Sequence, residues 1–244
     1  MAPCKVHPSR VVLLVAALLA APSIAAAQTT CAPGHKFTPQ DHDAILQAVV
    51  RHAPEVIGKI RFDEVTMQNR AGQVLRAALA VPEIAANVKS CVDILLQQRP
   101  LPPDAVGRVE QRYPQARQLL DGVAHAMSLS ALQEFLRHSG QEATQADVRT
   151  ALQTAQQIID RGKAVIYNSQ FYANAAQRYG SPDPAAIGSG MALELAKSDA
   201  KDAIVGGLFG AFAGPEAIGP AACDEAIRSS VTTVVEIFVD LWFG

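Results

Sequence analysis

The sequence predicts an all-α protein, an irregular bundle of several helices that ends in a glycine-rich helical hairpin. Apolar residues recur at spacings of three and four in most segments of the chain, which is the period of a helix with one buried face. Proline and capping residues stand where many of these segments begin or end. Alternating apolar and polar runs bounded by turn dipeptides, which are typical of strands, do not occur in the sequence.

Helical segments are expected along the whole first part of the chain. The apolar stripes place them over 38–53, 63–80, 82–99, 103–126, 130–140, 145–161 and 163–179. Thr38 and Asp41 have the spacing of a capping box at the start of the first segment. Pro114 interrupts the fourth segment. Ser130 suits the N-cap of the fifth segment, and Gly140 suits its C-cap.

A change in composition divides the chain near residue 180. The helical body covers residues 28–180, and the segment 181–190 is rich in glycine and proline, which predicts a loop or linker. Residues 191–244 are markedly apolar and predict a helical hairpin packed on the body.

Three glycines in the first arm of this hairpin lie four residues apart. Gly206, Gly210 and Gly214 therefore share one helix face, and we expect that face to let the second arm, from Pro220 onward, approach closely. The pattern is also similar to the glycine-zipper segments of membrane-active peptides. The uninterrupted apolar part, 203–214, is too short to cross a bilayer as a helix.

The N-terminus has the pattern of a secretory signal peptide. Lys5 and Arg10 precede the uncharged apolar run 11–21, and small residues before Gln28 fit a cleavage site. We expect residues 1–27 to be removed and the mature protein to be exported, either to a periplasm or to the medium.

The mature chain has no excess of basic residues. Removing the predicted signal peptide leaves 19 basic and 23 acidic side chains, a net charge of −4. A nucleic-acid partner is therefore not expected. The partner stays unknown, and the apolar segment 203–244 is the candidate surface for contact with a protein or a membrane.

Three cysteines remain in the mature chain, namely Cys31, Cys91 and Cys223. An exported protein permits a disulfide, and an odd number leaves one thiol unpaired. The sequence does not choose among the three possible pairs. Cys31 and Cys91 are the candidates that we single out, and their loop of about sixty residues corresponds to about 4 kcal/mol of stabilisation. The alternative is that Cys91 is a small core residue.

Two histidines lie on the apolar stripe of the first helix. His42 has Asp43 beside it, and His52 lies further along the same stripe. An acid–base site is one interpretation of His42, Asp43 and His52. The other is that the histidines are structural and lie at contacts between helices. The sequence has no spacing typical of a metal or cofactor site, so we expect neither.

Two further segments invite a functional interpretation. Ser198 and Lys201 have the spacing found in penicillin-recognising enzymes, but the other motifs of that class are missing or out of order, so we interpret Ser198 as an N-cap. The segment 167–179 combines three tyrosines with several amides. It is either a packed helix with a solvated amide face or a site for a polar ligand or partner.

The function predicted from these observations is that of an exported, non-catalytic helical protein with a binding or structural role. One alternative is a membrane-active or toxin-like protein that uses the glycine-rich hairpin. Another is a hydrolase-type enzyme with a site built from histidine and aspartate.

Overall fold

The computed structural model describes residues 29–66 and 69–243, and within them it contains eleven α-helices and no β-strand, which confirms the predicted all-α class. The predicted signal peptide, 1–27, lies outside the described residues. Two short 3-10 turns, η1 (Phe62–Glu64) and η2 (Pro215–Ala217), complete the elements. The helices in chain order are α1 (Pro39–Arg51), α2 (Ala53–Ile57), α3 (Arg70–Leu79), α4 (Pro82–Gln97), α5 (Ala105–Arg112), α6 (Ala116–His125), α7 (Leu129–Glu142), α8 (Ala146–Gly162), α9 (Ser169–Arg178), α10 (Pro184–Gly210) and α11 (Ile218–Phe243).

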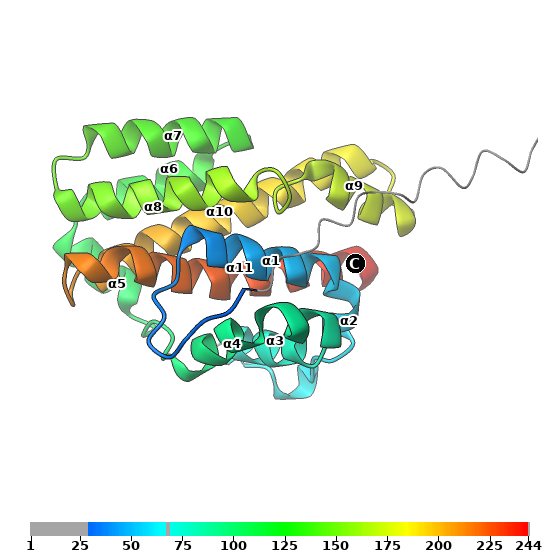
Figure 1. Ribbon diagram of the computed structural model, residues 1–244. Helices are drawn as coiled ribbons and strands as arrows, with labels where there is room; N and C mark the ends of the chain where they lie inside the picture. Colours follow the sequence, from blue (N-terminus) through cyan, green and yellow to red (C-terminus); the bar gives the residue numbers. More distant parts are fainter. Residues whose placement is uncertain (1–28, 67–68, 244) are drawn as a thin grey trace, which may run out of the picture.

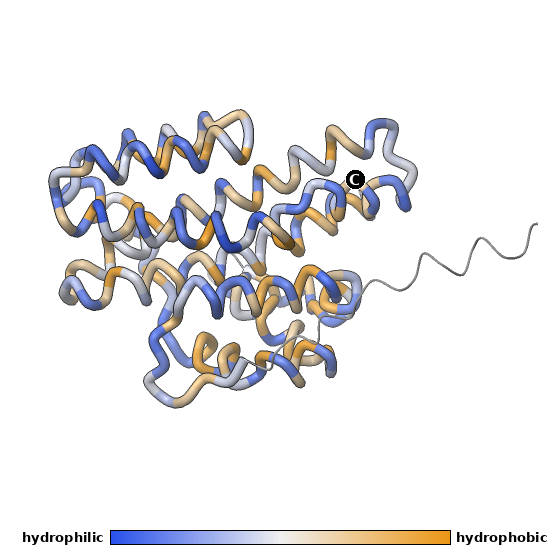
Figure 2. The backbone as a smooth tube through the Cα atoms, turned by 45° about the horizontal axis from the view of Figure 1, so that its top comes forward, coloured by the Kyte–Doolittle hydropathy of each residue, from blue (hydrophilic) through white to orange (hydrophobic). Residues whose placement is uncertain are grey.

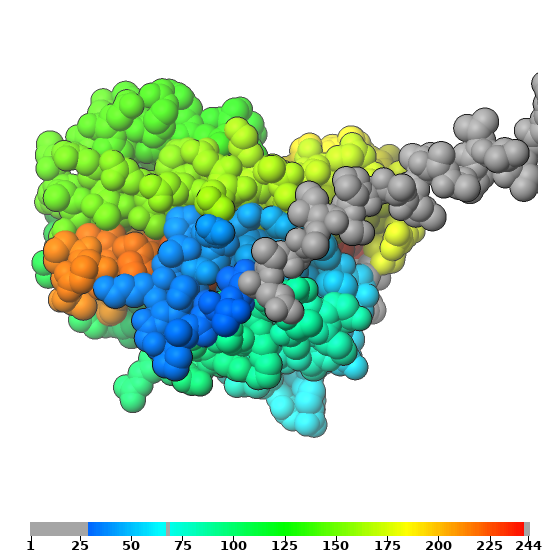
Figure 3. All heavy atoms as spheres, viewed as in Figure 1, coloured from blue at the N-terminus to red at the C-terminus, as the bar shows by residue number. Residues whose placement is uncertain are grey.

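The two longest helices, α10 and α11, form a hairpin at the centre of the molecule (Figure 1). Helices α8 and α9 pack against α10, while α1 and α3 pack against α11. Helix α7 lies on the outside, against α8, and α4 lies against α1 and α3. The space-filling view shows α1 and the segment before it, in blue, between α8 above and the helices α3 and α4 below (Figure 3). The hairpin therefore has helices of the body on several sides.

Most helices carry hydrophobic residues on one face and hydrophilic residues on the other (Figure 2), as the apolar period predicts. The hairpin differs, because large parts of it are buried on more than one side. Its buried hydrophobic residues include Ala203, Ile204, Val205, Leu208, Ala222, Ala226, Ile227, Val231 and Val234. Among the described residues, no helix combines the length and the apolar character that a membrane crossing requires.

Some predicted helix ends are confirmed and others are wrong. Thr38 and Asp41 form a capping box at the start of α1. At α7 the N-cap is Ser128, whose extended backbone lets its hydroxyl accept from the amide of Ala131, so Ser130 lies inside the first turn. Gly140 is not a C-cap, because the helix continues to Glu142.

The predicted linker 181–190 is mostly helical. Helix α10 begins at Pro184, where the side chain of Asp183 accepts a hydrogen bond from the amide of Ala186. One glycine of this stretch, Gly188, is required by close packing against α9. A Cβ added to Gly188 would lie 2.4 Å from the carbonyl oxygen of Ser169. Only a short connection therefore separates the helical body from the hairpin.

The segment 163–168, which was expected to be helical, is a turn before α9. The backbone carbonyl of Gly162 accepts hydrogen bonds from the amides of Val165, Ile166 and Tyr167. A Cβ on Gly162 would lie 2.7 Å from the ring of Tyr167. This close approach turns the chain inward and places the Tyr167 side chain in the core.

Glycines bring the two arms of the hairpin together. A Cβ on Gly206 would lie 2.6 Å from the carbonyl oxygen of Ala221, and one on Gly210 would lie 2.7 Å from that of Ala217. Gly214 has a different place, since α10 ends at Gly210 and Gly214 adopts a φ of 137° in the connection. The second arm begins at 218 rather than at Pro220, because proline fits the first turn of a helix.

Candidate functional site

A group of four polar side chains lies inside the helical core, and we call it the buried polar cluster. It consists of His42 from α1, Tyr167 from the turn before α9, Asp199 from α10 and Ser230 from α11. His42, Asp199 and Ser230 are fully buried, and Tyr167 is only 3% exposed. The cluster therefore joins four elements that lie far apart in the sequence.

Asp199 accepts the hydrogen bonds that connect this cluster. The hydroxyls of Tyr167 and Ser230 both donate to its carboxyl group. Nε2 of His42 lies 3.0 Å from Oγ of Ser230 and 3.4 Å from Oδ2 of Asp199. Oγ of Ser230 also lies 2.7 Å from the carbonyl oxygen of Ala226. Because its single proton goes to one of these two acceptor oxygens, His42 fits the tautomer that carries its proton on Nε2. The other ring nitrogen of His42, Nδ1, is buried without a hydrogen-bond partner.

Burial makes the phenols at this cluster hard to ionise. The pKa of Tyr167 is raised well above its ordinary value, first because the hydroxyl is desolvated and then because Asp199 lies beside it. Burial also raises the pKa of Tyr172, whose hydroxyl donates to the carbonyl of Ile166. Both tyrosines are therefore neutral hydrogen-bond donors in the folded protein.

This arrangement differs from a Ser–His–Asp catalytic triad. In a triad the carboxylate holds one ring nitrogen while the other faces an accessible serine. Here Ser230 and Asp199 approach the same nitrogen of His42, and the serine donates to the carboxyl group rather than to the imidazole. The Ser230 hydroxyl is also fully buried. The contacts are those of a structural hydrogen-bond network in the core.

The structure does not bring the other predicted catalytic candidates to His42. Asp43 accepts a hydrogen bond from Gln47, at 3.0 Å, and its second carboxyl oxygen is buried without a partner. His52 lies at the end of α1, where its side chain is 30% exposed and 4.0 Å from Glu55. The three residues His42, Asp43 and His52 therefore do not form one site.

The sequence interpretation missed Asp199 and Ser230. Both stand in the markedly apolar segment 191–244, for which the sequence suggested no polar candidate apart from Ser198 and Lys201. The prediction that Ser198 is an N-cap is wrong, since it lies inside α10. Its hydroxyl lies 2.7 Å from Oγ of Ser229 and 3.1 Å from Oγ1 of Thr233. Ser198 therefore contributes to the contact between the two arms of the hairpin.

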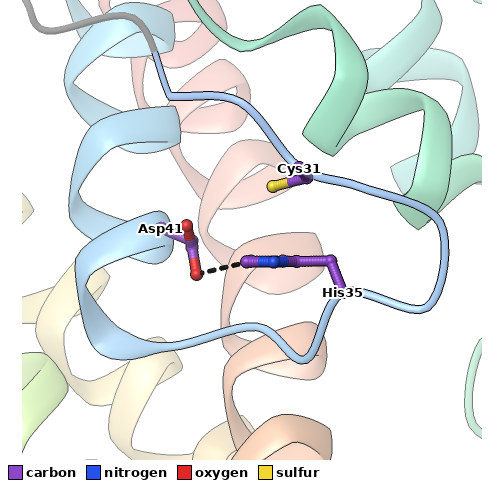
Figure 4. A group of neighbouring side chains, drawn as sticks. All are labelled: Cys31, His35 and Asp41. Atoms are coloured by element: carbon purple, nitrogen blue, oxygen red, sulfur yellow. Dashed lines mark hydrogen bonds and ion pairs between the residues drawn. The ribbon is translucent and has the colours of Figure 1, made fainter.

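A second polar group lies where the N-terminal segment meets α1 (Figure 4). Nε2 of His35 lies 3.0 Å from Oδ2 of Asp41, and the same oxygen accepts from the backbone and hydroxyl of Thr38. Cys31 lies close enough to form a three-residue metal site with His35 and Asp41. Its sulfur, however, is bonded to Cys91 and so has no thiolate to offer a metal.

The disulfide joins the N-terminal segment to α4. The two sulfur atoms of Cys31 and Cys91 are bonded across 60 residues of sequence, and Cys223 is free and buried. The amide of Cys31 also donates to the hydroxyl of Ser90, at 3.0 Å. Burial raises the pKa of the Cys223 thiol. Cys223 is therefore an unreactive core residue in the folded protein.

Acidic groups near the start of α11 have unusual titration properties. Burial raises the pKa of Asp224 to about 7 and that of Glu225 to about 7, and in both cases the nearby Arg228 acts in the opposite direction. Asp224 has one carboxyl oxygen that is buried without a partner. The guanidinium of Arg228 is not hydrogen-bonded to Asp224. It donates instead to the backbone carbonyls of Leu95 and Gln98.

Hollows large enough for ligands occur at the surface rather than at the buried polar cluster. One of about 620 Å³ lies between α7 and α8 and has glutamine and arginine side chains around an apolar floor. A smaller one, of about 260 Å³, lies between the ends of α1, α9 and α11. Neither hollow is lined by a member of the buried polar cluster.

No family model matches the chain, and no curated protein or solved structure shows significant similarity to it. The functional argument therefore depends on the residues themselves.

Proposed function

We propose that this chain is an exported, non-catalytic helical protein with a binding role, in which the C-terminal hairpin serves as the internal support of the fold. The observation that carries the proposal is that the side chains best suited to acid–base or nucleophilic catalysis are buried in the core. His42, Asp199 and Ser230 are fully buried and are hydrogen-bonded within the cluster, although Nδ1 of His42 has no partner there. A substrate has no path to them, whereas the surface offers open hollows.

The environment of the hairpin argues against a membrane-active role. Insertion of α10 and α11 would require both helices to leave contacts with α1, α3, α8 and α9. It would also break the hydrogen bonds of Asp199 with Tyr167 and Ser230, and buried polar groups that lose their partners are costly. Retention of the hairpin in the core is the more stable arrangement.

Export is supported by the signal-peptide pattern at the N-terminus and by the disulfide between Cys31 and Cys91, because disulfides persist in oxidising compartments. The intact mass of the exported protein tests this part. We expect a mature N-terminus at Gln28, and a mass that retains 1–27 would contradict it.

A serine-directed probe tests the absence of hydrolase chemistry. A fluorophosphonate phosphonylates an activated serine oxygen with loss of fluoride and of the hydroxyl proton, so it reports on Ser230 without knowledge of a substrate. We expect no labelling of the native protein. Labelling that disappears in Ser230→Ala but persists in Ser198→Ala would overturn the proposal and favour the hydrolase alternative.

A further inference from the structure

The smaller surface hollow has a composition that specifies a class of ligand. It lies where α9 meets the C-terminal part of α11 beside the end of α1, at the right of Figure 1. Its volume is about 260 Å³, which is small even for a ligand pocket. The residues that line it are Val50, Arg51, Pro54, Phe171, Asn174, Ala175, Arg178, Tyr179 and Phe238.

The floor of the hollow is apolar and aromatic. Phe171 and Phe238 pack with their ring centroids 6.0 Å apart, and both rings also contact Tyr172, which is fully buried beneath them. Val50 and Phe238 are 2% and 4% exposed. The floor is therefore held in place by the core, and the partly exposed ring of Phe171 is the aromatic surface that it offers to a flat apolar group.

The rim of the hollow carries positive charge without a matching negative charge. Arg51 and Arg178 are both exposed. Within the described ranges 29–66 and 69–243, neither guanidinium has a carboxylate or a hydrogen-bond acceptor as partner. None of the residues that line the hollow is acidic. The rim thus leaves two planar groups of donors free to receive an anion.

Asn174 adds a donor at the same place. Its side-chain oxygen accepts a hydrogen bond from Nε2 of Gln170, at 2.8 Å. The amide group of Asn174 is thereby oriented, and its Nδ2 hydrogens have no protein acceptor among the described residues. Arg51 and Arg178 therefore offer only donors to the hollow, and Nδ2 of Asn174 is a further donor.

We propose that this hollow binds a small aromatic carboxylate. The ring of the ligand lies against Phe171, whose own ring is supported by Phe238, and its carboxylate lies between Arg51 and Arg178, where a guanidinium can donate two parallel hydrogen bonds. This assignment deepens the binding role proposed above and depends on it. It also gives the amide- and tyrosine-rich segment 167–179 a ligand rather than only a packing role.

The test is a titration of the mature protein with 3-phenylpropanoate, followed by NMR and by calorimetry. A ligand of this size is expected to bind with a dissociation constant of about 0.1–1 mM. Its neutral analogue, 3-phenylpropanamide, has the same ring and nearly the same shape, and we expect it to bind about tenfold more weakly. Chemical-shift changes should centre on Asn174 and Arg178.

Matched variants separate the site from nonspecific binding of an anion. Arg178→Gln keeps a long polar side chain at an exposed position, so the variant should fold as the wild type does while it binds the carboxylate about tenfold more weakly. Arg161→Gln removes an exposed arginine from α8, which does not line the hollow. The affinity of this control should not change.

Three results would overturn the inference. They are equal affinity for the carboxylate and the amide, unchanged affinity in Arg178→Gln, and no shift with either compound at millimolar concentration. The fluorophosphonate experiment tests the non-catalytic role independently of these three results. If Ser230 stays unlabelled and the titration fails, the aromatic-carboxylate site is wrong while the non-catalytic role survives. If Ser230 is labelled, the proposed function fails whatever the titration gives.

Discussion

Asp199 is the residue on which the interior polar contacts depend, because it accepts hydrogen bonds from two other elements of the fold and lies beside a histidine of a third. Tyr167 and Ser230 donate to it, and His42 lies within 3.4 Å. A buried polar group is tolerated when it is fully partnered, and such a network then specifies how the helices meet. We therefore attribute a structural role to His42.

Removal of one donor from this cluster should destabilise the protein. Ser230→Ala deletes the hydroxyl without adding volume, and Tyr167→Phe deletes the other donor to Asp199. Each should lower the free energy of unfolding by about 1–3 kcal/mol, measured by urea denaturation. The double variant should be less harmful than the sum, because both changes act on one carboxyl group. His52→Gln is the control, and a comparable loss in that variant would contradict the assignment.

The raised pKa values of Asp224 and Glu225, both about 7, make stability dependent on pH. The folded protein keeps these groups protonated where the unfolded chain, with ordinary pKa values near 4, does not. Their contribution is therefore fully present below about pH 4 and is lost as the pH rises to about 7. The groups that face Asp224 are Glu225, Arg228 and His35.

Replacing the Asp224 carboxyl group by a neutral amide should remove part of the pH dependence of stability. Asp224→Asn is expected to be more stable than the wild type at pH 8, by about 2 kcal/mol, and to differ little from it at pH 4. Urea denaturation at the two pH values measures this. Asp121→Asn, at an exposed position on α6, should show neither effect. A gain for Asp224→Asn of the same size at both pH values would contradict the titration argument.

For single residues, the sequence predicted that His42 lies on the inward face of its helix, but it did not predict which residues His42 meets. An apolar stripe indicates which side chains turn inward, and His42 follows that rule. Asp199 and Ser230 stand in a segment that the sequence marks as apolar, so they were not singled out. Their meeting depends on the placement of α10 and α11 against α1, which periodicity within one helix does not contain.

At the scale of elements, the hairpin depends on glycine where the arms cross. Gly206 faces the backbone of Ala221 in α11, and Gly210 faces the backbone of Ala217 in η2 and the Cβ of Ala221, all at distances that a Cβ cannot accommodate. Gly190, in the same helix, has no atom within 4 Å of the position of an added Cβ. One helix thus contains both kinds of glycine, and this permits a matched comparison.

Alanine substitutions at Gly190 and at Gly210 should have opposite effects on stability. Gly190→Ala should stabilise the protein by about 0.5–1 kcal/mol, because alanine favours the helix. Gly210→Ala should destabilise it by about 1–3 kcal/mol, since its Cβ would lie 2.7 Å from Ala217 O and Ala221 Cβ. Gly210→Leu should be worse still. Chemical denaturation without detergent is the measurement, and a stabilising Gly210→Ala would show that the arms are apart.

Helix ends were harder to predict than helix faces. Composition made 181–190 resemble a linker, yet Gly188 is required by the close approach of α9 and so lies within α10. Glycine marks both turns and close contacts between helices, and only the tertiary structure distinguishes them. The same ambiguity explains why Gly140 was expected to end α7.

At the scale of the whole molecule, the disulfide fastens the N-terminal segment to α4. The bond between Cys31 and Cys91 closes a loop of 60 residues, and the amide of Thr29 adds a hydrogen bond to the carbonyl of Asn87. The sequence allowed three pairings of the cysteines. The choice depends on the path of the segment 29–38 across the helices, which has no periodic signal.

Reduction should weaken the fold substantially. We expect dithiothreitol to lower the free energy of unfolding of the wild type by about 2–4 kcal/mol. The double variant Cys31→Ala with Cys91→Ala should be equally weak and insensitive to the reductant. Cys223→Ala should keep the sensitivity of the wild type, because that thiol is free and buried. Sensitivity that disappears in Cys223→Ala would indicate a different pairing.

Hydrogen exchange tests most directly whether the C-terminal hairpin is the core of the fold. Backbone amides of α10 and α11 between 203 and 238 should exchange more slowly than those of α7, which lies on the outside. The rates should not change when anionic phospholipid vesicles are added. If the hairpin exchanges as fast as α7, or if vesicles expose or newly protect it, the hairpin is not held in the core, and the membrane-active alternative becomes the better explanation.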